Sequence, residues 1–152
     1  RRVLFRSLYE LRQPLEQQAA KLAAQRGNTQ IFTQLAAEFR NAERLIEGGD
    51  TGIKAYYNLN ERLDRAIEDA IASPYLVSAL KTLHLHLARI RRLSRRDPVR
   101  LKAAAIETLV IIEAIVDRNP ELAASATAVH MQQSLRNALE TARSRAVTER
   151  VA

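Results

Sequence analysis

Apolar residues recur at steps of three and four along almost the whole chain, and no stretch alternates apolar and polar residues as a half-buried strand does. Turn and cap signals divide this pattern into six amphipathic helices, which we expect at about residues 3–25, 29–47, 51–72, 74–90, 98–115 and 120–142. The connections between them are short, so successive helices are expected to be antiparallel neighbours. The pattern therefore predicts an all-α antiparallel bundle that forms one domain over residues 1–152.

The ends of these helices carry stop and start signals. Gly27 and the Gly48-Gly49 pair end the first two helices, because glycine adopts left-handed backbone at little cost. A polar residue followed by proline starts each of the last three helices, since proline fits the first turn. These starts are Ser73-Pro74, Asp97-Pro98 and Asn119-Pro120, and Asp50 or Thr51 is expected to cap the third helix. Pro14 is expected to bend the first helix, because it removes one backbone donor.

Polar residues interrupt two of the apolar stripes. Asn60 and Asp64 fall on or beside the stripe of the third helix, and their spacing of four places both side chains on one helix face. Thr108 lies on the apolar stripe of the fifth helix. These positions are candidates for a polar pocket inside the bundle.

The chain carries 24 Lys and Arg against 17 Asp and Glu, a formal net charge of +7. Excess positive charge favours association with polyanions, and much of it lies in residues 89–96, RIRRLSRR. Such a run is usually a solvated helix face, and an aromatic share of only 5% leaves few platforms on which single-stranded bases could stack. Nucleic-acid binding through this run is a separate, less favoured hypothesis.

Composition and motifs argue against an enzyme. The absence of cysteine removes thiolate nucleophiles, disulfides and cysteine-based zinc sites, and suits a reducing cytoplasm. No phosphate-binding glycine loop, nucleophile elbow or His-Glu metalloprotease motif is present. The longest apolar stretch, residues 109–112, is far too short for a membrane span, and the N-terminus lacks a secretory signal. It also lacks an initiator methionine, so we expect the chain to be part of a longer polypeptide.

A series of segments along nearly the whole chain follows the order and spacing of a known family. They are residues 8–16 (LYELRQPLE) continuing to 22–24 (LAA), Gly49-Asp50 ahead of 59–67 (LNERLDRAI), the turn at 73–76 (SPYL), 113–115 (EAI), 119–123 (NPELA), and a last helix that carries His130. Together they resemble the effector-binding domain (FCD) of FadR-like members of the GntR transcription regulators.

The resemblance implies a bundle of six to seven helices that encloses a cavity for a small organic effector, often a carboxylic acid, and that commonly contributes to dimerisation. In that family a winged helix-turn-helix domain precedes the bundle and contacts DNA. No such domain fits ahead of Leu8. The expectation is therefore an isolated effector-binding and dimerisation domain, with a homodimer as its assembly and DNA contacted only through a domain outside this chain.

Many members of the family hold a divalent metal with an Asp and a His four residues apart and two further His. The resemblance places these positions at Asn60, Asp64, Thr108 and His130. Neutral Asn60 and Thr108 are weak ligands for a transition metal, and such a site normally needs three good ones. We therefore expect no cofactor and no tightly held zinc, manganese or nickel. The degenerate site is expected to recognise its effector directly by hydrogen bonding.

The same polar residues have an interpretation without a ligand. Asn60 and Thr108 could be core groups whose hydrogen bonds are met by backbone carbonyls, and Asp64 could pair with an arginine. The pocket interpretation is favoured because burying several unpaired polar groups is costly. His84 and His86 lie two residues apart and are expected to point to different faces.

Arg12 is the candidate partner of an anionic effector, because a guanidinium holds a carboxylate with two parallel hydrogen bonds. The alternative for Arg12 is an ion pair with Glu16, one turn further along the same helix. Tyr56 and Tyr57 could line the same space or serve as ordinary packing.

The sequence thus predicts the ligand-sensing domain of a GntR-type regulator, which binds a small organic acid and modulates DNA binding by a separate domain. Its effector-binding residues are predicted to be Arg12, Asn60, Asp64, Thr108 and His130. The alternative is a helical protein-interaction or oligomerisation module without a small ligand, which the leucine-rich stripes alone would support.

Overall fold

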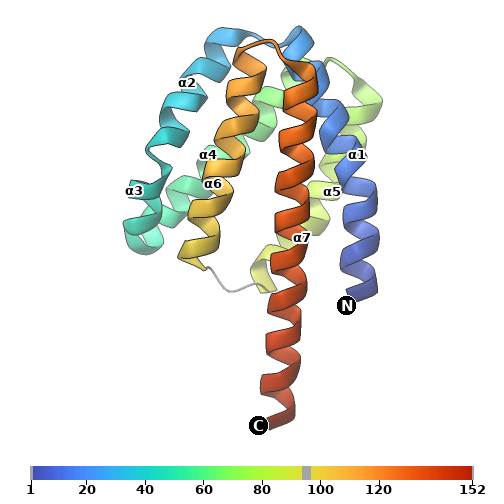
Figure 1. Ribbon diagram of the computed structural model, residues 1–152, viewed down its shortest axis with the longest axis vertical. Helices are drawn as coiled ribbons and strands as arrows, with labels where there is room; N and C mark the ends of the chain where they lie inside the picture. Colours follow the sequence, from blue (N-terminus) through green and yellow to red (C-terminus); the bar gives the residue numbers. More distant parts are fainter. Residues whose placement is uncertain (1, 94–96, 152) are drawn as a thin grey trace.

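The computed structural model describes residues 2–93 and 97–151, with side chains described for residues 2–88 and 97–151. Its helices are α1 (Arg2–Arg26), α2 (Thr29–Arg40), α3 (Ala42–Glu47), α4 (Gly49–Ile71), α5 (Pro74–Leu93), α6 (Pro98–Val116) and α7 (Pro120–Val151). Within the described residues there is no strand. The all-α bundle that the apolar periodicity predicts is therefore confirmed (Figure 1).

The first and last helices form the most extensive helix–helix contact of the bundle. α1 and α7 lie side by side and antiparallel, α7 also packs along α6, and α6 packs against α2 and α3 (Figure 1). The expectation that successive helices are neighbours holds for α6 and α7 but is wrong for α1 and α2, because α6 and α7 lie between them. The C-terminal end of α7 extends beyond the other helices (Figure 1).

The second predicted helix is broken in two at Asn41. Its backbone N–H bonds to the carbonyl of Glu38 at 3.1 Å and its side chain donates to the carbonyl of Ala37 at 3.2 Å, so the end of α2 is satisfied locally. The third predicted helix also begins earlier than expected. α4 starts at Gly49, whose φ of +71° is the left-handed backbone that glycine allows, and not after a cap at Asp50 or Thr51.

The other helices start where the sequence predicts, and side-chain capping contacts are present at the starts of α2 and α6. Asn28 caps α2 by accepting from the N–H of Gln30 at 2.9 Å, and Asp97 caps α6 by accepting from the N–H of Val99 at 3.0 Å. Prolines occupy the first positions of α5, α6 and α7, as their missing N–H permits. α1 continues through Pro14 as a single helix.

The main core is made of large apolar side chains from most of the helices. Burial of each such side chain contributes about 1.5–3 kcal/mol. The largest fully buried ones are Phe32, Ile71, Leu80, Ile112 and Ile115. A second, smaller cluster contains Tyr9, Leu87 and Met131. Residues of both clusters line the cavity described below, so the cavity lies between the two apolar clusters.

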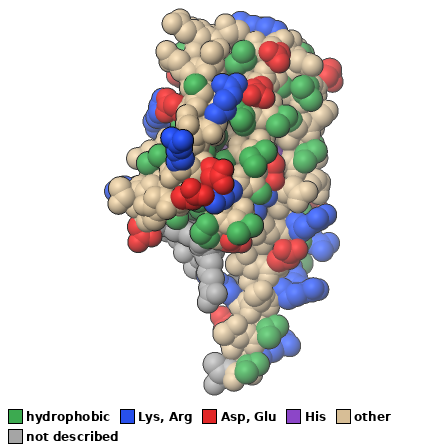
Figure 2. All heavy atoms as spheres, turned by 60° about the vertical axis from the view of Figure 1, so that its left-hand side comes forward, with side chains coloured by type: hydrophobic (Ala, Val, Ile, Leu, Met, Phe, Trp, Pro, Cys, Tyr) green, Lys and Arg blue, Asp and Glu red, His purple; other side chains and the backbone are tan. Residues whose placement is uncertain are grey.

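The face that carries α2, α3 and α6 shows acidic and basic side chains close together (Figure 2). Ion pairs of these helices include Lys102 with Glu47 at 2.8 Å and Arg40 with Glu113 at 3.1 Å. Among the described helices, none is long and apolar enough to cross a bilayer. The basic run at residues 89–96 lies outside the described side chains, so its role stays a prediction.

Candidate functional site

A cavity of about 160 Å³ lies between α1, α4, α5, α6 and α7. Of the five predicted effector-binding residues, Arg12, Asn60, Thr108 and His130 line it, although they come from four different helices. Asp64 is not among the lining residues. Residues that sequence reasoning did not select also border the cavity, namely Tyr9, Leu87, Asp97, Arg100, Leu101, Ala104, Ser134, Asn137 and Ala138.

Arg12 is the most deeply buried charged residue of the cavity lining, with 7% of its surface exposed. Its Nε lies 3.5 Å from Glu16 Oε1, and its guanidinium stands 5.3 Å from the centre of the Tyr9 ring. Among the described residues, its two terminal nitrogens make no hydrogen bond or ion pair. The expected contact with Glu16 is therefore present at one edge of the guanidinium. The two terminal nitrogens remain available as hydrogen-bond donors, so the interpretation of Arg12 as an effector-binding residue stays a prediction.

A second arginine that lines the cavity, Arg100, forms an ion pair with Glu107 through two hydrogen bonds. Arg100 donates from Nη1 to Glu107 Oε2 at 2.8 Å and from Nη2 to Glu107 Oε1 at 2.7 Å, the parallel pair of bonds typical of a strong arginine–carboxylate contact. His130 Nδ1 lies 2.8 Å from the same Glu107 Oε1. Arg100 is therefore less available to a ligand than Arg12.

Glu107 is ionised over the whole neutral and mildly acidic range. Burial alone would raise its pKa, but hydrogen bonds from His130 and Arg100 outweigh this effect and lower the pKa to about 2. Because an ionised carboxylate only accepts hydrogen bonds, His130 Nδ1 carries the hydrogen between them. The ring nitrogen of His130 that remains for other partners is Nε2.

Asn60 and Thr108 meet their hydrogen bonds within their own helices. Asn60 Nδ2 donates to the Tyr56 carbonyl at 3.1 Å, and Thr108 Oγ1 donates to the Ala104 carbonyl at 2.8 Å. No buried side-chain nitrogen or oxygen of the described residues lacks a partner. The cost of unpaired polar groups therefore gives no argument for a ligand at Asn60 and Thr108. The Thr108 oxygen can still accept a hydrogen bond from a ligand.

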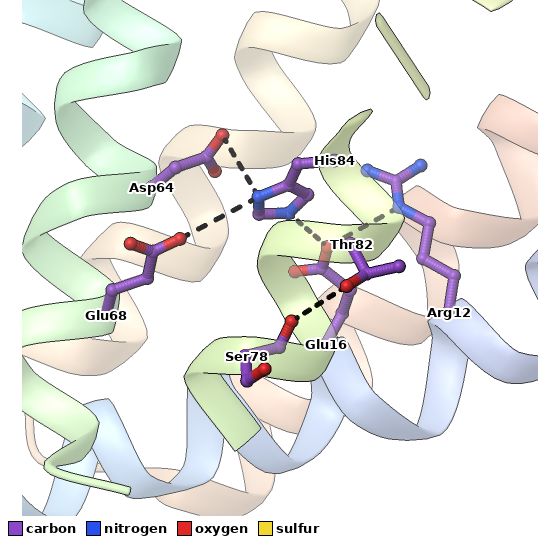
Figure 3. A network of polar contacts seen from close by, with 7 residues as sticks. All are labelled: Arg12, Glu16, Asp64, Glu68, Ser78, Thr82 and His84. Carbon is purple, nitrogen blue, oxygen red and sulfur yellow. Dashed lines mark hydrogen bonds and ion pairs between the residues drawn. The ribbon is translucent and has the colours of Figure 1, made fainter. Parts of the chain in front are cut away.

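Asp64 belongs to a polar network beside the cavity, shown in Figure 3. His84 Nδ1 lies 4.0 Å from Asp64 Oδ2 and 3.9 Å from Glu68 Oε1, and His84 Nε2 lies 3.0 Å from Glu16 Oε1. The contact of Asp64 within this network is thus with a histidine, and the expected pairing of Asp64 with an arginine stays a prediction, because the arginine-rich residues 89–96 lie outside the described side chains. Sequence reasoning missed this network, although a histidine amid the leucines of α5 was a visible signal.

Charges in the network shift two pKa values in opposite directions. Burial would raise the pKa of Glu16, but His84 and Arg12 lower it to about 2. Burial would lower the pKa of His84, but the hydrogen bond to Glu16 and the charges of Asp64 and Glu16 raise it overall, against a smaller opposing effect of Arg12. The network therefore stabilises a negative Glu16 and a positive His84 together.

The four positions that the family resemblance assigns to a metal do not fit one. Asn60 and Thr108 are neutral and bonded to backbone, Asp64 lies outside the cavity lining, and His130 is held by Glu107. In the described part of the chain, no group of three or more His, Cys, Asp or Glu side chains is placed to hold a metal ion. Only one side chain of the four, His130, is both a good ligand and part of the cavity.

Comparison with known proteins supplies the family. No curated protein matches the chain. The family model of the FCD domain matches residues 7–133. This range includes most of α1, all of α2 to α6 and the first part of α7. It also includes all residues named above for the cavity and the network except Ser134, Asn137 and Ala138. The chain therefore belongs to the FCD domain family, the C-terminal effector-binding domains of GntR-type regulators.

Proposed function

We propose that this FCD domain senses a small organic acid by binding its carboxylate to Arg12 inside the cavity. The observation that carries the proposal is the state of Arg12, a buried cation of the cavity wall whose two terminal nitrogens have no partner among the described residues. A carboxylate can take both nitrogens in parallel, which is the strongest geometry that a guanidinium offers.

The cavity volume limits the size of the acid. Its 160 Å³ is close to the roughly 150 Å³ of an engineered cavity that holds benzene, so a ligand of about six non-hydrogen atoms fits. Leu87, Leu101 and Ala104 provide apolar wall for a short hydrocarbon part. Thr108 Oγ1 supplies an acceptor for a hydroxyl group on the ligand, and His130 Nε2 is a second polar atom without a hydrogen-bond partner among the described residues.

The ligand is bound without a transition metal in this proposal. Support comes from the donor chemistry at Asn60 and Thr108, whose neutral side chains are already bonded to backbone carbonyls. A cation already stands in the cavity wall at Arg12, so the carboxylate has a positive partner without a metal.

The parent protein is proposed to be a FadR-type regulator that acts as a homodimer, with a separate winged helix-turn-helix domain that contacts DNA. Arg12 lies on α1, which packs on α4, α5, α6 and α7. A ligand that binds one arrangement of these helices better than another shifts the population toward it, and this shift would reach the DNA-binding domain.

A thermal-shift screen of small carboxylic acids against their neutral amides tests this function. A ligand specific for the folded state raises the melting temperature, so at least one acid is expected to stabilise the protein while its amide does not. Arg12→Gln is expected to abolish the effect, and Arg40→Gln, at an exposed ion pair, to preserve it. Stabilisation by no acid, or an equal effect in Arg12→Gln, would contradict the proposal.

A further inference from the structure

One oxygen of the Glu16 carboxylate, on α1, contacts two basic side chains. Glu16 Oε1 lies 3.0 Å from His84 Nε2 of α5 and 3.5 Å from Arg12 Nε, one turn earlier on α1 (Figure 3). The shorter contact belongs to His84. Glu16 therefore holds Arg12 by a single long contact at one edge, while the terminal nitrogens of Arg12, a residue that lines the cavity, have no partner among the described residues.

The surroundings of His84 favour a positive charge on its ring. Glu16 is ionised and only accepts, so His84 Nε2 must carry a hydrogen. On the other side, Nδ1 faces the carboxylates of Asp64 and Glu68 from α4 at 4.0 and 3.9 Å. A neutral ring would direct a lone pair at two negative groups, whereas a ring protonated at both nitrogens is attracted to them. The raised pKa of His84 agrees with this geometry.

Another ion pair of the same protein shows how a carboxylate binds arginine without a histidine. Glu38 takes both terminal nitrogens of Arg62, at 2.6 and 2.8 Å, and no histidine is among its described partners. An equally uncompensated Glu16 would draw the terminal nitrogens of Arg12 toward itself in the same way. The positive charge of His84 makes this movement of Arg12 toward Glu16 unfavourable, because it compensates much of the negative charge of Glu16.

We propose that His84 is a positioning residue for ligand binding: it neutralises Glu16 and so leaves the terminal nitrogens of Arg12 free for the carboxylate of an anionic ligand. The inference rests on the proposed function, because it assumes that the ligand's carboxylate binds Arg12. In this proposal, the cavity prefers an acid over a neutral molecule of the same shape because Arg12, Glu16 and His84 act together.

The test uses butyrate and butyramide, which have about the size that the cavity admits. His84→Gln keeps a side-chain donor toward Glu16 but removes the charge. Butyrate is expected to bind this variant about tenfold more weakly, with butyramide unchanged. In the Glu16→Gln background the same substitution is expected to change butyrate binding less than about twofold, since no negative charge is left to compensate. His86→Gln, at an exposed histidine of α5, is the matched control and should behave as wild type.

Two results would overturn the proposal. One is an equal loss for butyrate and butyramide in His84→Gln. The other is an equal effect of His84→Gln with and without the charge on Glu16. A histidine that only packs α5 against α1 would produce both, because packing depends neither on the ligand's charge nor on that of Glu16.

A measurement without ligand separates this proposal from the proposed function. In the side-chain NMR spectrum, the terminal hydrogens of Arg12 are expected to average in wild type, to separate in His84→Gln as Glu16 takes both nitrogens, and to average again in the double variant. If no acid of the thermal-shift screen binds wild type, the proposed function fails, while this pattern still supports the positioning of Arg12 by His84. An Arg12 spectrum that is identical in wild type and His84→Gln overturns the positioning role even if butyrate binds.

Discussion

Replacing Glu107 with glutamine tests most sharply how the cavity-lining residues Arg100 and His130 are held in place. Glu107 receives both terminal nitrogens of Arg100 and lies 2.8 Å from His130 Nδ1, with only 18% of its side chain exposed. Glutamine has nearly the same shape and keeps one carbonyl oxygen, so the substitution removes the charge with little change in packing.

The expected magnitude follows from the pKa of Glu107, which the fold lowers from 4.5 to about 2. At about 1.4 kcal/mol per pH unit, this corresponds to about 3 kcal/mol of unfolding free energy at pH 7. Because the folded-state pKa is depressed, the contribution is complete above pH 4.5 and is lost as the pH falls toward 2. At pH 3 less than half of it, about 1.4 kcal/mol, remains.

Urea unfolding of wild type and Glu107→Gln at pH 7 and pH 3 measures the difference directly. The gap in unfolding free energy should be about 3 kcal/mol at pH 7 and should shrink by more than half at pH 3. Glu113→Gln is the matched control on α6, because its exposed pair with Arg40 contributes at most about 1 kcal/mol. A loss below about 1 kcal/mol at pH 7, or a gap that does not depend on pH, would refute this account of the cavity wall.

Three further predictions concern the fold and the metal. Gly52→Ala should lower the melting temperature by roughly 5 °C, because its Cβ would overlap the Leu45 carbonyl. Gly49→Ala meets no atom within 4 Å and strains only the backbone at φ +71°, so it should cost less, and the reverse order would contradict this packing. Arg26→Met should cost about 1–3 kcal/mol in urea unfolding by removing the 2.6 Å bond to the Ile71 carbonyl at the end of α4, and an unchanged midpoint would contradict this cap. Dialysis against a chelator should leave the melting temperature and acid binding unchanged, whereas loss of either that added zinc restores would reveal a metal site.

Local signals were enough to predict most of the fold. Asp97 and the prolines at the helix starts act within one turn, so their effect can be read from neighbouring residues. The break at Asn41 was missed, because asparagine within a helical pattern gives no stop signal as clear as glycine or proline. The packing of α1 against α7 joins the two ends of the chain, and apolar periodicity within one helix does not identify its partner.

The candidate site was predictable only in part, for a related reason. Asn60, Thr108 and His130 were selected from apolar stripes and the family resemblance, and the structure brings them to one cavity with Arg12. Their partners could not be derived in this way, because Glu107 meets His130 across two helices and spacing within one helix does not show such a contact. Asp64 was predicted to face the ligand from its spacing with Asn60 and from the family resemblance, but it is not among the lining residues and lies 4.0 Å from His84 Nδ1.

The central claim is that Arg12 receives the carboxylate of a small acid, and a crystal structure of the domain with butyrate tests it most directly. The account predicts butyrate in the cavity of about 160 Å³, with its two oxygens about 2.7–3.0 Å from Arg12 Nη1 and Nη2 and with Glu107 still bonded to Arg100. Butyrate bound instead in the groove of about 570 Å³ between α2 and α4, or in the cavity with its carboxylate away from Arg12, would contradict the claim.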